Sequence, residues 1–275
     1  MTSSLVLSVT TFIYAASAIL YISSWIFNLK KIVKFATLTG IAAISGNLLG
    51  FILRWIESYK IGYGHIPLSN LYESLIFFAL TIAVICLVLE WKYDVPHINA
   101  FSMPLAFITI AYAALKGGTT EIQPLIPALK SNWLTVHVLT CFLGYAGFAI
   151  AFGISVMFIF KKSVNQGEIV SRLPEDMILD ELTQQTIMFG FLFLSLGIIT
   201  GAVWANSAWG SYWTWDPKET WSLITWFVYA IFLHLRYMRE WHGTRLAVVS
   251  IIGFMAVMFT YFGVNYLPGL HSYGK

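Results

Sequence analysis

The chain has 275 residues, of which 58% are hydrophobic and 11% are charged, with a net charge of +3 and a mean hydropathy of +0.75. Soluble domains carry about 25% charged residues, so this composition excludes an ordinary soluble domain and predicts a polytopic membrane protein. The small, dispersed net charge does not indicate a nucleic-acid partner. Cys86 and Cys141 lie far apart in apolar runs and form no CxxC pair, which argues against thiol–disulfide or thiolate–metal chemistry.

Eight apolar runs are long enough to cross a bilayer, because a transmembrane helix needs about 20 residues. The first has no basic residue and no small-residue cleavage site before Lys30, which predicts a retained span rather than a signal peptide. With no internal repeat and no long linker, the sequence predicts an all-α bundle of about eight transmembrane helices and a single domain over 1–275. The runs are 5–29, 35–53, 68–89, 98–115, 134–160, 185–205, 219–237 and 246–266.

The basic residues predict which side of the membrane each connection faces. The connections after the odd-numbered runs carry ten Lys and Arg residues, and the other side carries six. The positive-inside rule therefore places the first set in the cytoplasm, and both termini and the tryptophan-rich connection outside. The polar segment 161–185 is expected to be a short solvated cytoplasmic helix. The ten residues are Lys30, Lys31, Lys34, Lys92, Lys161, Lys162, Arg172, Arg236, Arg239 and Arg245.

The second external connection ends in the sequence GHIPLSNLYESLIFF. Pro67, Ser69 and Asn70 are typical of a helix start, and Glu73 lies about one turn inside the next span. An ionisable group at that depth is costly without a partner or a wet cavity. A functional role and a cap-like role at the helix N-terminus both stay open for Glu73. His65 is expected to be a solvated loop residue.

The most unusual stretch, 204–226, surrounds an Asp-Pro-Lys-Glu turn with tryptophan. Asp216 is expected to cap a helix with Pro217 at its first position and Glu219 at its third, which forms a capping box. Tryptophan joins a flat apolar face to one N–H donor, so a cluster favours either a membrane-interface belt or a surface for a flat aromatic ligand. The tryptophans are Trp204, Trp209, Trp213, Trp215 and Trp221.

Two histidines share the predicted face of this stretch: His137 opens the fifth span, and His271 follows the eighth. Imidazole is a common haem-iron ligand, and two imidazoles would hold a macrocycle axially over an aromatic surface. A hydrogen-bonded interfacial histidine is the alternative for each. His234 lies 18 residues after Asp216, roughly 27 Å along a helix and near the inner leaflet. There its neighbours Arg236 and Arg239 are typical of a cytoplasmic helix end, so an ordinary interfacial histidine is expected.

Several strings resemble one family. WGSYWTWDPKETWSLITWFVYAIFLHLR is similar to the WWD signature of haem-handling proteins, and PLSNLYESLIFF, VHVLTCFLGYAGF and GVNYLPGLHSYG extend the match over most of residues 65 to 275. The chain resembles the CcsA/ResC family of cytochrome c biogenesis proteins. The signature is shared with CcmC and CcmF, whereas the closing histidine motif and the eight-span layout favour CcsA.

The resemblance implies a function. With a ResB-type membrane subunit, the protein would carry haem b to the outer face and present it for attachment to CxxCH of apocytochrome c, as the haem-binding subunit of a holocytochrome c synthase. It implies that His137 and His271 are axial ligands of the haem iron and that His234 is a transient ligand. The residues facing the macrocycle would be Trp209, Trp213, Trp215, Asp216 and Trp221.

Three other interpretations remain at this point. A haem transporter without synthase activity would line its path with buried polar groups such as Asn47, Glu73 and His234. A protein of the CcmC or CcmF type would handle haem in a different maturation system. A b-type cytochrome would need histidine pairs at equal depth within spans. The expected location is a bacterial cytoplasmic membrane, with a plastid thylakoid membrane as the alternative.

Overall fold

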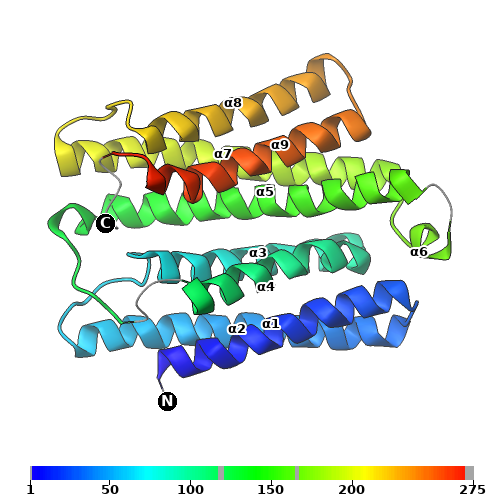
Figure 1. The fold of residues 1–275 in the computed structure, drawn as a ribbon, viewed down its shortest axis with the longest axis horizontal. Coiled ribbons are helices and arrows are strands. Elements are labelled where there is room, and N and C mark those ends of the chain that lie inside the picture. Colours follow the sequence, from blue (N-terminus) through cyan, green and yellow to red (C-terminus); the bar gives the residue numbers. More distant parts are fainter. Residues whose placement is uncertain (1, 117–120, 165–166, 270–275) are drawn as a thin grey trace. The chain divides into compact units, whose positions relative to one another are not determined.

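The computed structural model describes residues 2–116, 121–164 and 167–269, and within these ranges every regular element is a helix (Figure 1). The prediction of an all-α helical protein is therefore confirmed. The chain divides into two compact units, unit 1 (Met1–Ile126 and Phe160–Pro174) and unit 2 (Pro127–Ile159 and Glu175–Lys275). That the two act as one domain stays a prediction.

Unit 1 is built from four long helices. Water is absent from the bilayer core, so an apolar segment must satisfy its backbone N–H and C=O groups internally, and a helix does this within one segment. In unit 1, α1 packs along α2 and α4, and α3 packs along α4. The long helices are α1 (Ser3–Ile26), α2 (Lys30–Lys60), α3 (Leu71–Tyr93) and α4 (Asn99–Lys116); η1 (Pro96–Ile98) and α6 (Glu168–Ser171) are short.

A buried ion pair closes one end of unit 1. Glu73 Oε1 lies 2.8 Å from Arg54 Nε of α2, and both side chains are almost fully buried. Its other oxygen, Oε2, accepts from the Ser69 backbone N–H at 2.9 Å and the Ser69 hydroxyl at 2.7 Å, while Asn70 caps α3. The carboxylate therefore has a cationic partner and also stabilises the helix start, as the cap-like alternative predicted. A functional role for Glu73 stays a prediction.

His65 lies in the same connection, and the expectation that it is solvated is wrong. Its side chain is buried, and its two ring nitrogens lie 3.0 Å from the carbonyl oxygens of Ile66 and Gln123. The backbone N–H of His65 also donates to Ser58 Oγ at 3.2 Å. The ring therefore connects the segment before α3 to the segment after α4. These contacts join distant parts of the chain, so no local sequence pattern predicts them.

The other end of unit 1 is tied together by one carboxylate. Glu90 of α3 accepts from the Tyr21 hydroxyl of α1 at 2.5 Å, from Thr37 Oγ1 of α2 at 2.6 Å and from Asn99 Nδ2 of α4 at 2.5 Å. A partly buried carboxylate needs several hydrogen bonds to offset its lost hydration. Glu90, on α3, obtains them from the other three long helices, and so joins all four.

Unit 2 contains the predicted tryptophan stretch. Its helices are α5, from Asn132 as far as Ile159, α7 (Asp176–Trp209), α8 (Pro217–Met238) and α9 (Thr244–Tyr261), with short turns η2 (Pro127–Leu129) and η3 (Gly263–Tyr266). As a secondary-structure element α5 runs over Asn132–Val164, and its last residues belong to unit 1. Helices α8 and α9 pack side by side, as the orange and red ribbons of Figure 1 show.

Glycines bring α5 and α7 into backbone contact. A Cβ atom added at Gly144 would lie 2.9 Å from the Leu194 nitrogen and 3.0 Å from the Gly190 oxygen, and one added at Gly147 would lie 2.9 Å from the Thr186 oxygen. Small residues at a membrane helix interface permit this close approach. The α5–α7 seam thus fixes one helix against the other along several turns.

Seven described helices are long and apolar enough to cross a membrane, whereas eight spans were predicted. The predicted run 219–237 does form a helix, α8, but α8 is not among those seven. The polar segment 161–185 is also organised differently from the expected single short helix. It contains the four-residue α6, and its last ten residues are already the first turns of α7.

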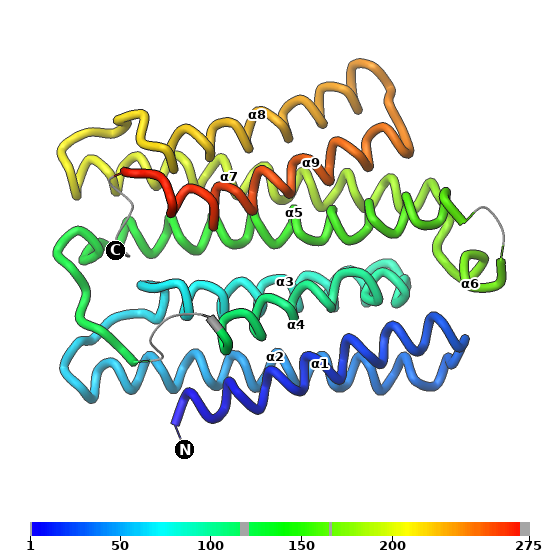
Figure 2. The backbone as a smooth tube through the Cα atoms, in the orientation of Figure 1, coloured from blue at the N-terminus to red at the C-terminus, as the bar shows by residue number. Residues whose placement is uncertain are grey.

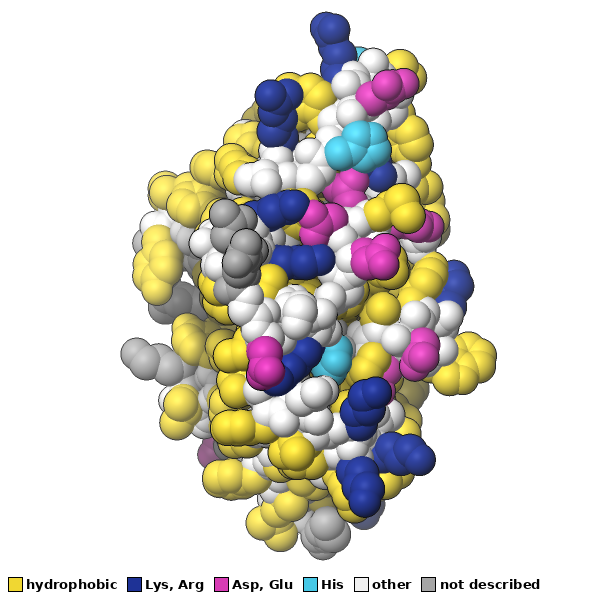
Figure 3. Space-filling view, turned by 90° about the vertical axis from the view of Figure 1, so that its right-hand side faces the viewer, with side chains coloured by type: hydrophobic (Ala, Val, Ile, Leu, Met, Phe, Trp, Pro, Cys, Tyr) yellow, Lys and Arg dark blue, Asp and Glu magenta, His cyan; other side chains and the backbone are white. Residues whose placement is uncertain are grey.

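A charged cluster ties α7 to the connection between α8 and α9. Asp180 of α7 pairs with Arg236 of α8 and lies 2.9 Å from His242 Nδ1, and it accepts from the Gly243 backbone N–H at 3.1 Å. Figure 3 looks at the face that carries this connection and shows acidic, basic and histidine side chains gathered on it. Charges of both signs therefore fasten this end of unit 2.

Candidate functional site: the tryptophan loop and His137

The tryptophan loop joins α7 to α8 and has a sharply folded backbone. Helix α7 is capped at its C-terminus by Gly210, whose φ of 75° suits glycine, and Trp215 also has a positive φ of 60°. A bulky side chain rarely adopts this conformation, which costs roughly 1–3 kcal/mol and persists where the surroundings impose it. The Trp215 side chain is 68% exposed and Tyr212 is also exposed, so the loop presents aromatic rings outward.

The predicted capping box is confirmed at the start of α8. Asp216 Oδ1 accepts from the Lys218 backbone N–H at 2.9 Å, and Glu219 Oε2 accepts from the Asp216 N–H at 3.2 Å and the Thr214 N–H at 2.7 Å. Both carboxylates are buried. Burial lowers the pKa of Lys218, while the neighbouring Asp216 carboxylate opposes that shift. The acids therefore define the shape of the loop from which the tryptophans project.

His137 lies in the second turn of α5, as predicted, and α7 holds its ring. Its Nδ1 lies 2.7 Å from the Gly197 carbonyl oxygen, and a carbonyl only accepts, so Nδ1 carries the proton. That tautomer leaves the lone pair on Nε2, the atom that ligates a metal when a carbonyl holds the other nitrogen. The ring fits closely because Gly201 has no side chain: a Cβ there would lie 2.6 Å from Nδ1.

The tryptophans form two groups rather than one continuous shelf. Trp204 is buried, donates its indole N–H to the Ala128 carbonyl at 2.9 Å, and stacks on His137 with ring centroids 6.0 Å apart and an interplanar angle of 13°. Trp209 meets Trp204 edge-on at 4.9 Å. In the loop, the exposed Trp215 and the half-buried Trp213 meet edge-on at 5.7 Å.

Trp221 belongs to neither group, since it packs against Phe259 of α9 with centroids 4.1 Å apart. Its assignment to the macrocycle stays a prediction.

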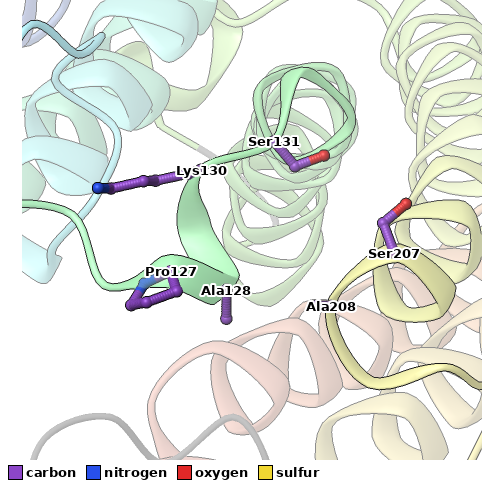
Figure 4. A pocket seen from close by; sticks show the side chains of 6 residues that line it. All are labelled: Pro127, Ala128, Lys130, Ser131, Ser207 and Ala208. Atoms are coloured by element: carbon purple, nitrogen blue, oxygen red, sulfur yellow. The ribbon is translucent and has the colours of Figure 1, made fainter.

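A small polar cavity lies beside the first group. It measures about 320 Å³ and is lined by Ser131 at the start of α5, Ser207 near the end of α7, and the η2 turn with Ala128 (Figure 4). In that view the Lys130 side chain extends away from the two serines. The volume is near the lower limit of small-molecule pockets, about 300–1,000 Å³. Two hydroxyls therefore line the cavity, and the η2 turn connects it to Trp204 through the Ala128 carbonyl.

The described end of the C-terminal segment, residues 262–269, lies close to the start of α8. After α9 the chain turns through η3 and passes the start of α8, where the end of the red tube lies beside the yellow loop in Figure 2. A Cβ added at Gly269 would lie 2.4 Å from Asp216 Oδ2 and 3.1 Å from Pro217 Cδ. His271, the second predicted iron ligand, lies outside the described residues.

His234 is on α8, 18 residues after Asp216, as the sequence implied, and its side chain is exposed at the surface of unit 2. His234 is separate from His137 and Trp204. His137 contacts α7 near the tryptophan loop, whereas His234 lies toward the other end of α8. Its transient role stays a prediction.

Across the described residues, no group of three or more His, Cys, Asp or Glu side chains could bind a metal ion.

Sequence reasoning missed the residues that position the site. The Gly197 carbonyl contacts the His137 ring, and Gly201 leaves the space for it. The Ala128 carbonyl orients Trp204, and Gly269 allows the C-terminal segment to reach Asp216. The spacing of Gly197 and Gly201, one helical turn apart, is the one local signal that indicates a recess on α7. The roles of Ala128 and Gly269 depend on contacts between distant parts of the chain.

The fold is that of a multi-pass helical membrane protein, and its sequence matches the model of a known family. The chain belongs to the cytochrome c assembly protein family, whose family model matches residues 68–271. It therefore acts in cytochrome c biogenesis, as its resemblance to CcsA implied.

The relatives are more specific. The chain is 38% identical to the cytochrome c biogenesis protein CcsA of Mesostigma viride, over 94% of this chain and 95% of that one. It is 39% identical to CcsA of Prochlorococcus marinus strain SARG, over 87% and 84%, and 41% identical to CcsA of Guillardia theta, over 80% and 79%. The fold is similar to a solved cytochrome c haem lyase, CcmF, with a TM-score of 0.67 at 16% identity, over 96% of this chain and 50% of that one.

Proposed function

We propose that this protein binds haem b at the tryptophan loop, on the outer face of a bacterial cytoplasmic or plastid membrane. With a ResB-type membrane subunit it presents the haem for covalent attachment to CxxCH of apocytochrome c. The observation that carries the proposal is the state of His137. Its Nδ1 lies 2.7 Å from the Gly197 carbonyl oxygen, and its ring is stacked on Trp204. A carbonyl at that position favours the tautomer with the proton on Nδ1, and this tautomer keeps a lone pair on Nε2 for iron.

The second axial ligand in this proposal is His271. What supports it is that the chain passes Asp216 at Gly269, two residues earlier. Trp209, Trp213 and Trp215 supply flat apolar faces for the macrocycle in the same unit. His234, exposed on α8, is assigned to haem on its way from the inner side.

In this proposal the protein promotes thioether formation mainly by orienting the haem. Each thioether forms when a cysteine S–H adds across a haem vinyl group, so sulfur bonds to carbon, the proton ends on the neighbouring carbon, and no oxidant is consumed. Fixing the macrocycle by two axial ligands and aromatic contacts removes translational and rotational freedom, a large part of such a barrier. The histidine of CxxCH then displaces one protein imidazole, and the product leaves.

The test is an absorption spectrum of the purified chain, with and without the ResB-type subunit, for wild type and His137→Ala. We expect a low-spin six-coordinate haem in the wild type and its loss in the variant at normal protein level. Free imidazole added to the variant should restore the six-coordinate spectrum. A variant that keeps this spectrum excludes His137 as a ligand. Thioether formation on a CxxCH peptide then separates a synthase subunit from a haem transporter, which would bind haem and form no product.

A further inference from the structure

We propose that unit 2 binds an internal water molecule among three buried hydroxyls, those of Ser155 on α5, Tyr229 on α8 and Ser250 on α9. Each of these residues is 0% exposed, and among the described residues none of the three hydroxyl oxygens has a hydrogen-bond partner. Most buried polar groups are paired with protein or with ordered water, so three orphaned hydroxyls from three helices indicate a bound ligand. The site is separate from the tryptophan loop and does not depend on haem binding.

The two serines differ from the other buried hydroxyls of unit 2. A serine or threonine inside a helix can donate to the carbonyl oxygen four residues earlier. The buried threonines of α7, α8 and α9 do so at 2.8 to 2.9 Å. Ser155 and Ser250 make no such bond within the part of the chain that the structure describes. Their hydroxyls therefore need a partner other than their own helix.

The position of the Tyr229 hydroxyl is fixed by contacts on two sides. The ring stacks on Phe148 of α5, with centroids 3.6 Å apart and an interplanar angle of 4°. A Cβ added at Gly253 of α9 would lie 2.7 Å from Tyr229 Cζ and 3.0 Å from its hydroxyl oxygen. The ring has no room to swing away, so its hydroxyl stays in the interior beside the α9 backbone. An unpaired hydroxyl in such surroundings costs free energy.

An aromatic pair shows that the two serines lie at the same level of unit 2. Phe152 of α5 and Phe254 of α9 stack with centroids 4.8 Å apart, and the two helices run in opposite directions (Figure 1). Ser155 follows Phe152 by three residues, and Ser250 precedes Phe254 by four. Both serines are therefore about one turn, roughly 5 Å, to the same side of the stacked pair and on the same helix faces as its rings.

The spacing of the hydroxyls and their neutral charge suit one water molecule. Gly253, which the Tyr229 hydroxyl contacts, is three residues from Ser250 on the same face of α9, so these two hydroxyls lie about one turn apart. A direct hydrogen bond does not span that distance, whereas one bridging water does, because each of its bonds is about 2.8 Å long. Water offers two donors and two acceptors and can satisfy all three neutral hydroxyls.

The sign of one stability change tests the site. Tyr229→Phe removes a single oxygen, and loss of a hydrogen bond to water should raise the unfolding equilibrium constant of the purified chain in detergent about fivefold. A hydroxyl without a ligand predicts the opposite, because the variant then loses an unpaired buried oxygen. Tyr14→Phe in unit 1 is the matched control. Tyr14 is also 0% exposed, and its hydroxyl accepts from Asn47 Nδ2 at 3.2 Å, so this variant should lose stability.

Combined substitutions test whether the three hydroxyls share one ligand. Ser155→Ala, Ser250→Ala and Tyr229→Phe are measured singly and in pairs by denaturant unfolding. Groups that bind the same water lose less stability together than the sum of their single losses, whereas independent groups add. We expect each of the three pairs to fall short of the sum.

An unchanged or increased stability of Tyr229→Phe overturns the inference, because no bond to water is then lost. Additive losses overturn it as well. Coupling confined to one pair indicates a direct hydrogen bond between two hydroxyls, which also overturns it. If Tyr229→Phe does not accumulate, the pair Ser155→Ala and Ser250→Ala decides by the same comparison. None of these measurements uses haem, so each outcome leaves the proposed function to be decided by its own spectra.

Discussion

The two units use polar side chains in opposite ways. In unit 1 two acidic side chains of α3 have partners within the unit: Glu73 pairs with Arg54, and Glu90 accepts hydrogen bonds from neutral donors on three other helices. In unit 2 the histidine near the tryptophan loop is only half-buried, and exposed aromatic rings stand in the same loop. The difference teaches that a polar residue within a membrane segment indicates function only after its partners are known, since Glu73 and His137 carry similar signals in the sequence.

The largest effect is expected from breaking the buried pair of unit 1. Glu73→Ala leaves the buried Arg54 guanidinium without the Glu73 carboxylate, and loss of one member of such a pair costs about 3–5 kcal/mol. We expect the protein to disappear from membranes, which immunoblotting measures, without a preceding change in the haem spectrum of any residual protein. Glu73→Ala that accumulates normally and loses haem would instead give Glu73 a role in haem handling.

A smaller loss of stability should follow from changing the carboxylate that joins the four helices. In Glu90→Gln, one oxygen that accepts hydrogen bonds becomes an NH₂ group facing the donors Tyr21, Thr37 and Asn99. An unsatisfied buried group costs about 1–3 kcal/mol. The melting temperature in detergent should fall while the haem content per folded protein stays constant. A melting temperature equal to that of the wild type would show that Glu90 does not hold the helices together.

Paired glycine substitutions compare the two units directly. In Gly201→Ala the new Cβ would lie 2.6 Å from His137 Nδ1, whereas in Gly40→Ala of α2 the nearest atom, Ser17 Oγ, is 3.3 Å away. We expect Gly201→Ala to tilt the imidazole and reduce six-coordinate haem about tenfold, and Gly40→Ala to leave the spectrum unchanged. Equal spectra for the two variants would mean that the recess on α7 does not set the orientation of His137.

The smallest effect concerns the exposed loop ring. Trp215→Ala removes a side chain with few contacts to lose, so stability should stay within about 0.5 kcal/mol. Haem retention should nevertheless fall about fivefold, since an aromatic contact contributes about 1 kcal/mol beyond buried area. Titration of the purified variant with haem measures this, and Trp215→Phe should be milder. Unchanged retention would support a membrane-interface role for Trp215.

The sequence was sufficient for features determined by nearby residues. Hydropathy located each helix to within a few residues in most cases, and Asp216, Pro217 and Glu219 predicted the start of α8 because a capping box is a local pattern. The sequence also placed His137 near the start of α5. The sequence could not reveal that Arg54 pairs with Glu73, that His65 is buried, or that the Gly197 carbonyl contacts the His137 ring. Each of these contacts joins residues from separate elements.

The seam between α5 and α7 has a consequence for the order in which haem ligands exchange. Glycines bring the two backbones into contact, so sliding α5 by one turn, about 5.4 Å, would require many contacts to break together. If His137 ligates haem as proposed, we therefore expect it to keep a constant depth and angle while haem is handled. The described end of the chain after α9 meets the start of α8 at Gly269, which lies beside Asp216 and Pro217. We expect the incoming histidine of apocytochrome c to replace His271 first, with His137 as the ligand released last.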